Sequence, residues 1–217
     1  MRRLLLFAKR PRRGKVKTRL CPPLDERQAV SLYRGFVTDL LSLLRDCSAD
    51  YRSEIWWDGP ADDPALAGFD VAGLQVREQT PGDLGQRLEF AFGEADVPTV
   101  VLGADSPTIG RQAVDRAFES LSERRPVVIQ PALDGGYVLL GQWRPCRELF
   151  QGIPWGESGV CEATLRQADS RGLRVELLAP GYDVDDGDGL RRLEAELADP
   201  VVAARAPATQ RALRLLF

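Results

Sequence analysis

Residues 4–8, Leu-Leu-Leu-Phe-Ala, are followed at once by residues 9–20, Lys-Arg-Pro-Arg-Arg-Gly-Lys-Val-Lys-Thr-Arg-Leu. The first segment is continuously apolar and short, which is typical of a strand buried on both faces of a sheet. The second segment combines many cations with Pro11 and Gly14, which predicts a loop. A buried strand that ends in a cationic loop indicates a sheet that binds an anion beyond the carboxyl end of the strand.

Short apolar strands alternate with amphipathic helices along the rest of the chain. We expect strands at 51–58, 74–77, 99–103, 127–130, 137–140 and 173–178, of which 137–140 is the candidate for an antiparallel one. Helices are expected from Asp25 to Leu44, at 84–95, 110–122 and 157–171, from the acidic loop 183–188 to Leu197, and at 205–217. This alternation predicts a mainly parallel, Rossmann-like α/β sheet flanked by helices. We expect one domain over residues 1–217, with 200–217 as a C-terminal helical extension.

Charge is distributed unevenly. The chain has 29 Lys and Arg against 32 Asp and Glu, but nine of the cations lie in the first twenty residues, where there is no acid. The remaining 197 residues therefore carry a net charge of −12. A cationic segment on an acidic body favours a small anionic ligand held at one place and argues against nucleic acid as the partner.

The sequence contains no histidine, which excludes Ser-His-Asp and Cys-His sites, histidine-zinc centres and a histidine general base. A metal, if used, would be bound by carboxylates, which favours Mg²⁺ or Mn²⁺. The four cysteines are widely spaced and form no Cys-x-x-Cys pair, so no disulfide framework is indicated. Residues 4–8 are too short for a signal-peptide core and no long apolar segment follows, so we expect a cytoplasmic protein without membrane association.

Four loops follow the predicted strands at the edge where ligands of such sheets bind: 9–23, 104–108, 131–136 and 179–188. In the first, Gly14 and the surrounding cations are suited to phosphate oxygens, although the spacing is not that of a Walker A loop. The alternatives are a solvated basic tail or a patch that touches nucleic acid.

Carboxylates occupy two of the other loops. Asp105 follows a buried strand and could hold a divalent cation that bridges a diphosphate, or it could be an ordinary turn aspartate before Ser-Pro. Asp183 and Asp185 could supply the opposing metal ligands, while Asp186 or Asp188 could cap the next helix and favour its N-terminus.

Two further segments are suited to a sugar or a similar polar ligand. Asp134-Gly135-Gly136-Tyr137 combines a carboxylate with glycines that allow close approach, but the same pattern makes a tight turn between strands. Pro154-Trp155-Gly156-Glu157-Ser158 offers an indole that could stack on a sugar face, or a buried Trp beside a helix cap.

Taken together, these segments resemble the DUF2064 family, which includes arsenosugar-biosynthesis glycosyltransferases, within the nucleotide-diphospho-sugar transferase (GT-A) superfamily. The resemblance extends from Leu4 to about Leu197. It depends on the order and spacing of six motifs: Phe-Ala-Lys-x-Pro-x-x-Gly-x-Val-Lys-Thr-Arg-Leu at 7–20, Gly-Asp-Leu-Gly-x-Arg at 82–87, Gly-x-Asp-x-Pro at 103–107, Asp-Gly-Gly-Tyr at 134–137, Gly-Ile-Pro-Trp-Gly at 152–156 and Asp-Val-Asp at 183–185.

The resemblance implies roles for particular residues in a GT-A site. Lys9, Arg13, Gly14, Lys17 and Arg19 would bind phosphates, and Gln79, Gly82, Asp83 and Arg87 would line the nucleoside site. Asp105, with Asp183 and Asp185, would bind Mg²⁺ or Mn²⁺, and Asp105, Asp134 and Asp185 would be the catalytic carboxylates. Gly135, Gly136, Tyr137, Trp155, Gly156, Glu157 and Ser158 would face the transferred sugar or the acceptor.

The sequence departs from the family pattern in two places. Ala104 stands where the family commonly has Thr before the metal aspartate. The family's Asp-Val-Asp-Thr-Pro-Glu-Asp-Leu is here Asp-Val-Asp-Asp-Gly-Asp-Gly-Leu, which keeps both leading carboxylates but loses the proline that starts the helix.

The resemblance implies a metal-dependent glycosyltransferase that moves a sugar from a nucleoside diphosphate sugar to a small acceptor. The alternatives are a guanylyltransferase-like nucleotidyltransferase acting on an NTP and a catalytically silent nucleotide-binding protein. The first loop lacks the Ala-Gly-Gly-x-Ser-x-Arg pattern of many nucleotidyltransferases, which favours sugar transfer.

Overall fold

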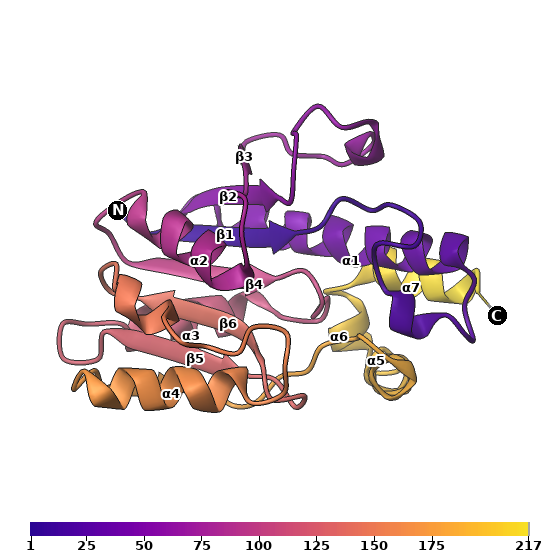
Figure 1. Cartoon of the computed structure of the whole chain (residues 1–217). Helices are drawn as coiled ribbons and strands as arrows, with labels where there is room; N and C mark the ends of the chain where they lie inside the picture. Colours follow the sequence, from indigo (N-terminus) through magenta and orange to yellow (C-terminus); the bar gives the residue numbers. More distant parts are fainter. Residues whose placement is uncertain (217) are drawn as a thin grey trace.

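The computed structural model describes residues 1–216. Its centre is a seven-stranded sheet in the order β3-β2-β1-β4-β6-β5-β7 (Figure 1). The strands are β1 (Arg3–Ala8), β2 (Arg52–Trp57), β3 (Gln75–Glu78), β4 (Thr99–Gly103), β5 (Val127–Pro131), β6 (Tyr137–Gln142) and β7 (Val175–Leu177). All neighbouring strands are parallel except β6, which is antiparallel to both β4 and β5. The predicted mainly parallel sheet, with an antiparallel strand after residue 136, is confirmed.

Helices cover both faces of this sheet. They are α1 (Glu26–Cys47), α2 (Leu84–Gly93), α3 (Arg111–Ser120), α4 (Val160–Ser170), α5 (Gly187–Glu196), α6 (Pro200–Ala203) and α7 (Pro207–Arg214). Three short 3₁₀ helices, η1 (Thr18–Leu20), η2 (Pro64–Leu66) and η3 (Arg147–Phe150), were not expected from the sequence. Within the described residues no helix has the length and apolar content needed to span a bilayer.

Strand β1 contributes to the apolar core on both sides of the sheet. Leu4, Leu6 and Ala8 pack with residues of α1, α3, α5 and α7. Leu5 and Phe7 pack on the opposite face with residues of α2, α4 and η3. Successive side chains of a strand point to opposite faces, so a continuously apolar strand is the expected sequence of one covered on both sides.

Helix α1 begins as its sequence predicts. The Asp25 carboxylate accepts the N–H groups of Arg27 and Gln28 at 2.7 and 2.8 Å, and the Gln28 side chain accepts the Asp25 N–H at 2.8 Å. These reciprocal bonds form a capping box, which satisfies N–H groups that have no partner within the helix.

The C-terminal helix α7 lies against α1 (Figure 1). The buried Asp39 carboxylate of α1 accepts the N–H groups of Ala208 and Thr209 in the first turn of α7, at 2.9 and 2.8 Å. At Gly35 the two helices approach closely, because an added Cβ would lie 3.0 Å from the Cα of Thr209, tight enough that α7 would have to shift. The helix expected at 205–217 is thus present over Pro207–Arg214, and Phe217 lies outside the described residues.

One of the N-terminal cations is part of the core. The Arg3 guanidinium forms two hydrogen bonds to the Glu54 carboxylate, at 2.9 and 3.0 Å, and both side chains are buried. Trp56 donates to the same carboxylate at 2.9 Å, and Arg3 also donates to the Ala91 carbonyl. Arg3 therefore holds β1 to β2 and α2 and is not available to a ligand.

Candidate active site

The loops at the carboxyl ends of the strands lie together, as the sequence pattern predicts. The Val184 N–H donates to the Asp105 carbonyl at 2.9 Å, which joins the loop after β4 to the acidic loop. The Gly181 N–H donates to the Pro131 carbonyl at 2.8 Å, which joins the same acidic segment to the end of β5. The first loop enters this edge through Lys17.

Lys17 lies at the centre of the site. Its side chain is only 2% exposed, and its ammonium contacts the Asp105 carboxylate and lies 2.8 Å from Oδ1 of Asp185. The rings of Tyr33 and Phe36 flank it, with centroids 5.8 and 5.4 Å from Nζ. Burial lowers the pKa of Lys17, but the charges of Asp105 and Asp185 outweigh it and raise that pKa above its usual value. Lys17 is therefore a fixed cation between two carboxylates.

The backbone of Lys17 is as unusual as its environment. Its φ is 51°, in the left-handed region, and it is the only non-glycine residue with positive φ among those described. Non-glycine residues rarely adopt this conformation and do so where the surrounding structure holds them in it. It directs the chain into η1, which places Arg19 next to the site.

The two predicted acidic ligands of the last loop have different environments. Ser106 donates to Asp183 at 2.7 Å. Burial raises the pKa of Asp183, the Ser106 hydrogen bond opposes this, and the charges of Asp105, Asp134 and Asp185 add to it, giving about 6. Burial also disfavours the charged form of Asp185, but the charge and hydrogen bond of Lys17 outweigh it. Together with the charges of Lys9 and Arg19, they lower the pKa of Asp185.

The next aspartates of this loop serve the helix that follows. Asp186 caps α5, because its carboxylate accepts the N–H groups of Asp188 and Gly189 at 3.0 and 2.9 Å. Asp188 pairs with Arg191 on the surface. The helix cap expected of this loop is therefore present at Asp186, and the role of Asp183 and Asp185 as metal ligands stays a prediction.

Fewer side chains converge on a possible metal position than the sequence predicts. Within residues 1–216 no group of three or more acidic or cysteine side chains converges closely enough to hold a metal ion. Asp105 and Asp185 nevertheless fit a cation, since they already share one in the Lys17 ammonium, and their oxygens are ligands of the kind that Mg²⁺ and Mn²⁺ prefer. Asp183 is instead engaged by Ser106.

Only some of the cations in the first loop are free to meet a ligand. Arg10 pairs with Asp58 at 3.1 Å and with Asp63 at 2.7 Å, and Arg12 also pairs with Asp63. These two arginines therefore fix the loop to the segment after β2.

The remaining cations of this loop are exposed. Lys9, Arg13, Lys15 and Arg19 form no ion pair with any residue that the structure describes. The charges of Lys9 and Arg19 reach Asp185, where they lower its pKa. Arg13 and Gly14 lie farther along, in the turn at 13–15, where Gly14 has a φ of 65°.

The residues predicted to line the nucleoside site form one group beside the ends of β1 and β2. Gln79 donates to the Trp56 carbonyl at 2.8 Å and accepts from Arg87 at 3.2 Å. Arg87 also donates to the Gly82 carbonyl at 2.9 Å. The Asp83 carboxylate accepts the Gln86 N–H at 2.9 Å and caps α2, so it has a structural role.

The two segments predicted to face a sugar also lie next to each other. The turn between β5 and β6 is closed by the Ala132 N–H, which donates to the Gly136 carbonyl, and the Asp134 carboxylate accepts the Gly136 N–H at 2.9 Å. Gly135 has a φ of 93°, and an added Cβ would lie 2.8 Å from the Gly159 nitrogen. The tight-turn alternative is therefore correct as a description of the backbone.

The aromatic residues of these segments pack on each other. The rings of Tyr137 and Trp155 meet edge to face at 6.5 Å, and the Trp155 indole also lies where Gly85 of α2 has no side chain. The Tyr137 hydroxyl is buried and has no partner in the described structure. Gly156, Glu157 and Ser158 are exposed.

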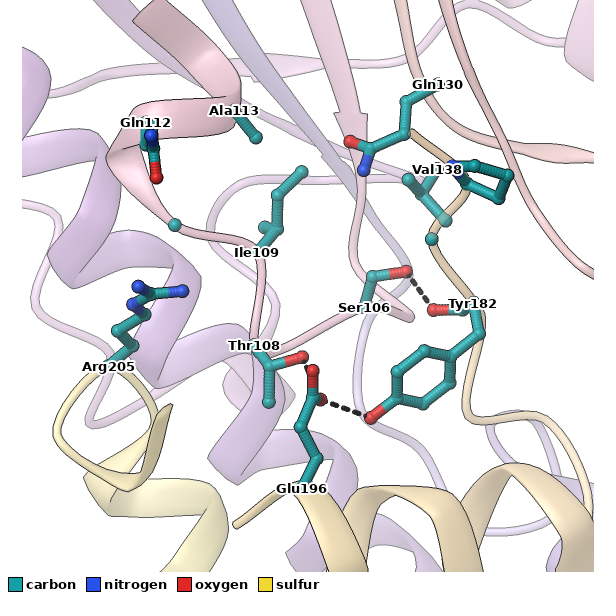
Figure 2. Close-up of a pocket in the computed structure, with 13 residues that line it drawn as sticks. Ser106, Thr108, Ile109, Gln112, Ala113, Gln130, Val138, Tyr182, Glu196 and Arg205 are labelled. Atoms are coloured by element: carbon teal, nitrogen blue, oxygen red, sulfur yellow. Dashed lines mark hydrogen bonds between the residues drawn. The ribbon is translucent and has the colours of Figure 1, made fainter. Parts of the chain in front are cut away.

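A cavity of about 240 Å³, which the sequence did not reveal, is lined by residues that include Ser106, Thr108, Tyr182 and Glu196 (Figure 2). Tyr182 and Thr108 both donate to the Glu196 carboxylate, at 2.6 and 2.8 Å. The Ser106 hydroxyl lies 2.7 Å from the Tyr182 carbonyl as well as from Asp183, so its single O–H is shared between these two acceptors. These bonds therefore connect Tyr182 and Asp183 of the acidic loop to the loop after β4 and to α5. The polar residues involved come from the loop after β4, the segment before α5 and α5 itself, which are far apart in the sequence.

Comparisons with known proteins agree with this architecture. The model of the family described as "Uncharacterized protein conserved in bacteria (DUF2064)" matches residues 44–157. The 3-phospho-D-glycerate guanylyltransferase of Phenylobacterium zucineum (strain HLK1) is 26% identical over 208 residues, which are 92% of this chain and 89% of that protein.

Solved structures show the same arrangement. A protein of Desulfovibrio desulfuricans G20, provisionally named a nucleotide-diphospho-sugar transferase, superposes with a TM-score of 0.82 and 30% identity over 99% of this chain and 97% of that one. A cytidylyltransferase of Leptospira borgpetersenii shares the fold with a TM-score of 0.55 and 15% identity, over 91% and 86% of the two chains.

Proposed function

Because the chain belongs to the DUF2064 family and has the fold of nucleotide-diphospho-sugar transferases, we propose that it is a metal-dependent glycosyltransferase. It would move a sugar from a nucleoside diphosphate sugar to a small acceptor. The observation that carries the proposal is the meeting of Lys17, Asp105 and Asp185 at the carboxyl edge of the sheet, beside exposed cations. This is where doubly wound sheets bind their ligands.

The first loop would bind the diphosphate of the donor. Lys9 and Arg19 are exposed, and their charges lower the pKa of Asp185, so both lie near that carboxylate. Their side chains can therefore neutralise phosphate oxygens bound close to it. Arg13 and Gly14 would contact the diphosphate from the turn at 13–15. Arg10 and Arg12 hold the loop in place through their pairs with Asp58 and Asp63.

Asp105 and Asp185 would hold Mg²⁺ or Mn²⁺. A divalent cation bound there supplies charge stabilisation to the departing nucleoside diphosphate. Asp183 would assist from its position on Ser106.

The donor's nucleoside and sugar would lie on opposite sides of these carboxylates. Gln79, Gly82 and Arg87 form the group suited to the nucleoside. Asp134 is exposed, and the hydrogen bond that its carboxylate accepts from the Gly136 N–H leaves lone pairs for a sugar or acceptor hydroxyl. Tyr137 and Trp155, with Gly156, Glu157 and Ser158, would form the wall next to the sugar.

Nucleotidyl transfer is the second candidate, and it is favoured by one observation. The guanylyltransferase relative is similar to this chain over 92% of its length, so the similarity is not confined to one part of the fold. The same carboxylates and cations would then stabilise attack on the α-phosphate and the release of pyrophosphate.

Thermal stabilisation by a panel of ligands, with and without Mn²⁺, tests the proposal. The panel contains UDP, GDP, CDP and dTDP sugars and the four NTPs, and each ligand that stabilises the protein is then assayed for products. We expect a nucleotide sugar to raise Tm and to be hydrolysed slowly to nucleoside diphosphate and free sugar. Pyrophosphate release from GTP with 3-phospho-D-glycerate would instead establish the second candidate.

Variants separate catalysis from binding. Asp105→Ala should abolish donor hydrolysis while the circular dichroism spectrum is retained. Asp96→Ala is the matched control, because Asp96 is an exposed aspartate paired with Arg144 before β4, at the opposite edge of the sheet. Binding without turnover under all conditions would indicate a silent binding protein, and stabilisation by no nucleotide would contradict both enzymatic candidates.

A further inference from the structure

We propose that Lys17 is an internal counter-ion that suppresses divalent-cation binding by the free protein, so that the metal binds together with the phosphates of the donor. This inference rests on the proposed function and adds an order of binding to it. Four observations lead to it: the placement of Lys17, its immobility, the open side of its two carboxylates and the engagement of Asp183.

Lys17 is placed as an ion between Asp105 and Asp185, not as a surface residue. Its ammonium contacts both carboxylates, and its side chain is 2% exposed. An ammonium has three N–H donors, so the two carboxylates leave one for another acceptor. The charge of Lys17 is therefore shared with its partners even before a ligand arrives.

The side chain has little freedom to move away. The rings of Tyr33 and Phe36 lie on it from α1, and its backbone occupies a conformation that a non-glycine residue adopts only when neighbours enforce it. A surface lysine of a flexible loop would have neither constraint. Lys17 thus remains beside the carboxylates whether or not a ligand is bound.

The carboxylates are open on their other side. Asp105 and Asp185 are 39% and 45% exposed, although the ammonium they share is buried. A divalent cation can therefore approach them from solvent while Lys17 contacts them from within. The bound cation and the Lys17 ammonium would then lie close together, on opposite sides of the same carboxylates.

The charge of Lys17 weakens the attraction between this pair of carboxylates and an approaching divalent cation. With Lys17 in place the Asp105–Asp185 pair has a net charge of −1 instead of −2, and the ammonium repels the incoming ion at short range. Asp183 lies close enough for its charge to interact with Asp105 and Asp185, but the hydrogen bond with Ser106 occupies its Oδ1, so it does not add a free ligand atom to the pair. The phosphates of a donor would add the anionic oxygens that the free site lacks, so metal and donor should bind with positive coupling.

Mn²⁺ titration of the free protein, followed by electron paramagnetic resonance of unbound Mn²⁺, tests this inference without an activity assay. We compare the wild type with Lys17→Met, which keeps the length of the side chain without its charge, and with Lys17→Gln, which keeps N–H donors. Lys15→Met is the matched control, because Lys15 is an exposed lysine of the same loop. Each titration is repeated with saturating UDP or GDP.

We expect both uncharged variants to bind Mn²⁺ roughly tenfold or more tightly than the wild type without nucleotide. The tightening that the nucleotide produces should be smaller in the variants than in the wild type. Lys15→Met should match the wild type in the titration without nucleotide. Circular dichroism identifies the variants that fold, and either uncharged variant is sufficient for the comparison.

The other results would overturn the inference in distinguishable ways. Equal or weaker Mn²⁺ binding by the folded variants, with nucleotide-dependent Mn²⁺ binding intact in the wild type, would refute the role of Lys17 and leave the proposed function standing. Absence of Mn²⁺ binding in all proteins, with and without nucleotide, would remove both the inference and the metal from the proposed function.

Discussion

The Arg3–Glu54 pair shows how much one buried contact can matter at the scale of single residues. Glu54→Gln would leave the buried guanidinium without its counter-charge, and removing one member of such a pair typically costs about 3–5 kcal/mol. We expect a clear loss of Tm in Glu54→Gln. Glu162→Gln is the matched control, because Glu162 pairs with Arg166 on the exposed surface of α4, and it should melt like the wild type.

The same pair has a predictable dependence on pH. Burial opposes the ionisation of Glu54, but the hydrogen bonds and charge of Arg3 outweigh it and hold its pKa below the usual value. A carboxyl with a lowered pKa in the folded state stabilises the protein above its unfolded pKa, about 4.3, and loses that contribution as pH falls through the folded value. The difference in Tm between wild type and Glu54→Gln should therefore shrink below about pH 4. A difference that is constant from pH 7 to pH 3 would contradict this account.

Residue-level patterns explain which site roles the sequence could and could not reveal. Asp105 and Asp185 were predictable because they lie in loops that follow strands, and the structure brings them together through Lys17. The contact of Lys17 with carboxylates was not foreseen, since it depends on the backbone angle of one residue and on two rings from the next helix. Direct contact of any of these residues with phosphate, sugar or metal stays a prediction.

At the scale of elements, two helix glycines, Gly35 of α1 and Gly93 of α2, have different surroundings and so different expected responses to substitution. Gly35 of α1 lies where a Cβ would meet the backbone of Thr209, at 3.0 Å. Gly93, the last residue of α2, has only the Arg147 side chain within 4 Å of the same added atom. Alanine favours a helix over glycine by about 1 kcal/mol in the interior and by less at an end.

We therefore expect Gly35→Ala to lower Tm, because α7 must move away, and Gly93→Ala to leave Tm unchanged or raise it slightly. Urea denaturation of both variants measures the two free energies of unfolding. Stabilisation by Gly35→Ala would show that α7 does not hold this position against α1.

Element boundaries were predictable where local chemistry sets them. The capping box at Asp25 fixes the start of α1, and the two-faced apolar pattern of residues 4–8 identifies β1. The short helices η1, η2 and η3 were not predictable, because no apolar period marks helices of three or four residues and tertiary contacts decide them.

At the scale of the whole molecule, the positive charge of the first twenty residues is partly used within the protein. Arg3, Arg10, Arg12 and Lys17 pair with carboxylates among the residues that the structure describes. The sequence could show the nine cations but not these pairings, which join residues about 50 to 170 positions apart. The field available to a ligand is therefore weaker and more localised than the charge count indicates.

This distribution predicts which arginines matter for donor binding. Arg19→Ala should weaken the affinity for a nucleotide ligand and reduce its dependence on salt, because an exposed cation next to Asp185 is lost. Arg12→Ala should change both less, since the guanidinium of Arg12 is already paired with Asp63. Calorimetry at low and high ionic strength measures both effects, and equal losses in the two variants would refute this division of the loop.

The antiparallel strand β6 has a consequence for how this molecule can diversify. The loops that carry Lys17, Asp105 and Asp185 each lead into or out of a helix on a face of the sheet, so a change in their length would shift a packed helix. The connection from β5 to β6 is different, because it is a hairpin whose two strands are hydrogen-bonded neighbours. Gly135 is held to α4 by the hydrogen bond that it accepts from the Cys161 N–H at 2.9 Å, but Leu133 and Asp134 at the tip are exposed. Under the proposed function, new acceptor preferences can therefore evolve by changes at this tip while the donor side stays constant.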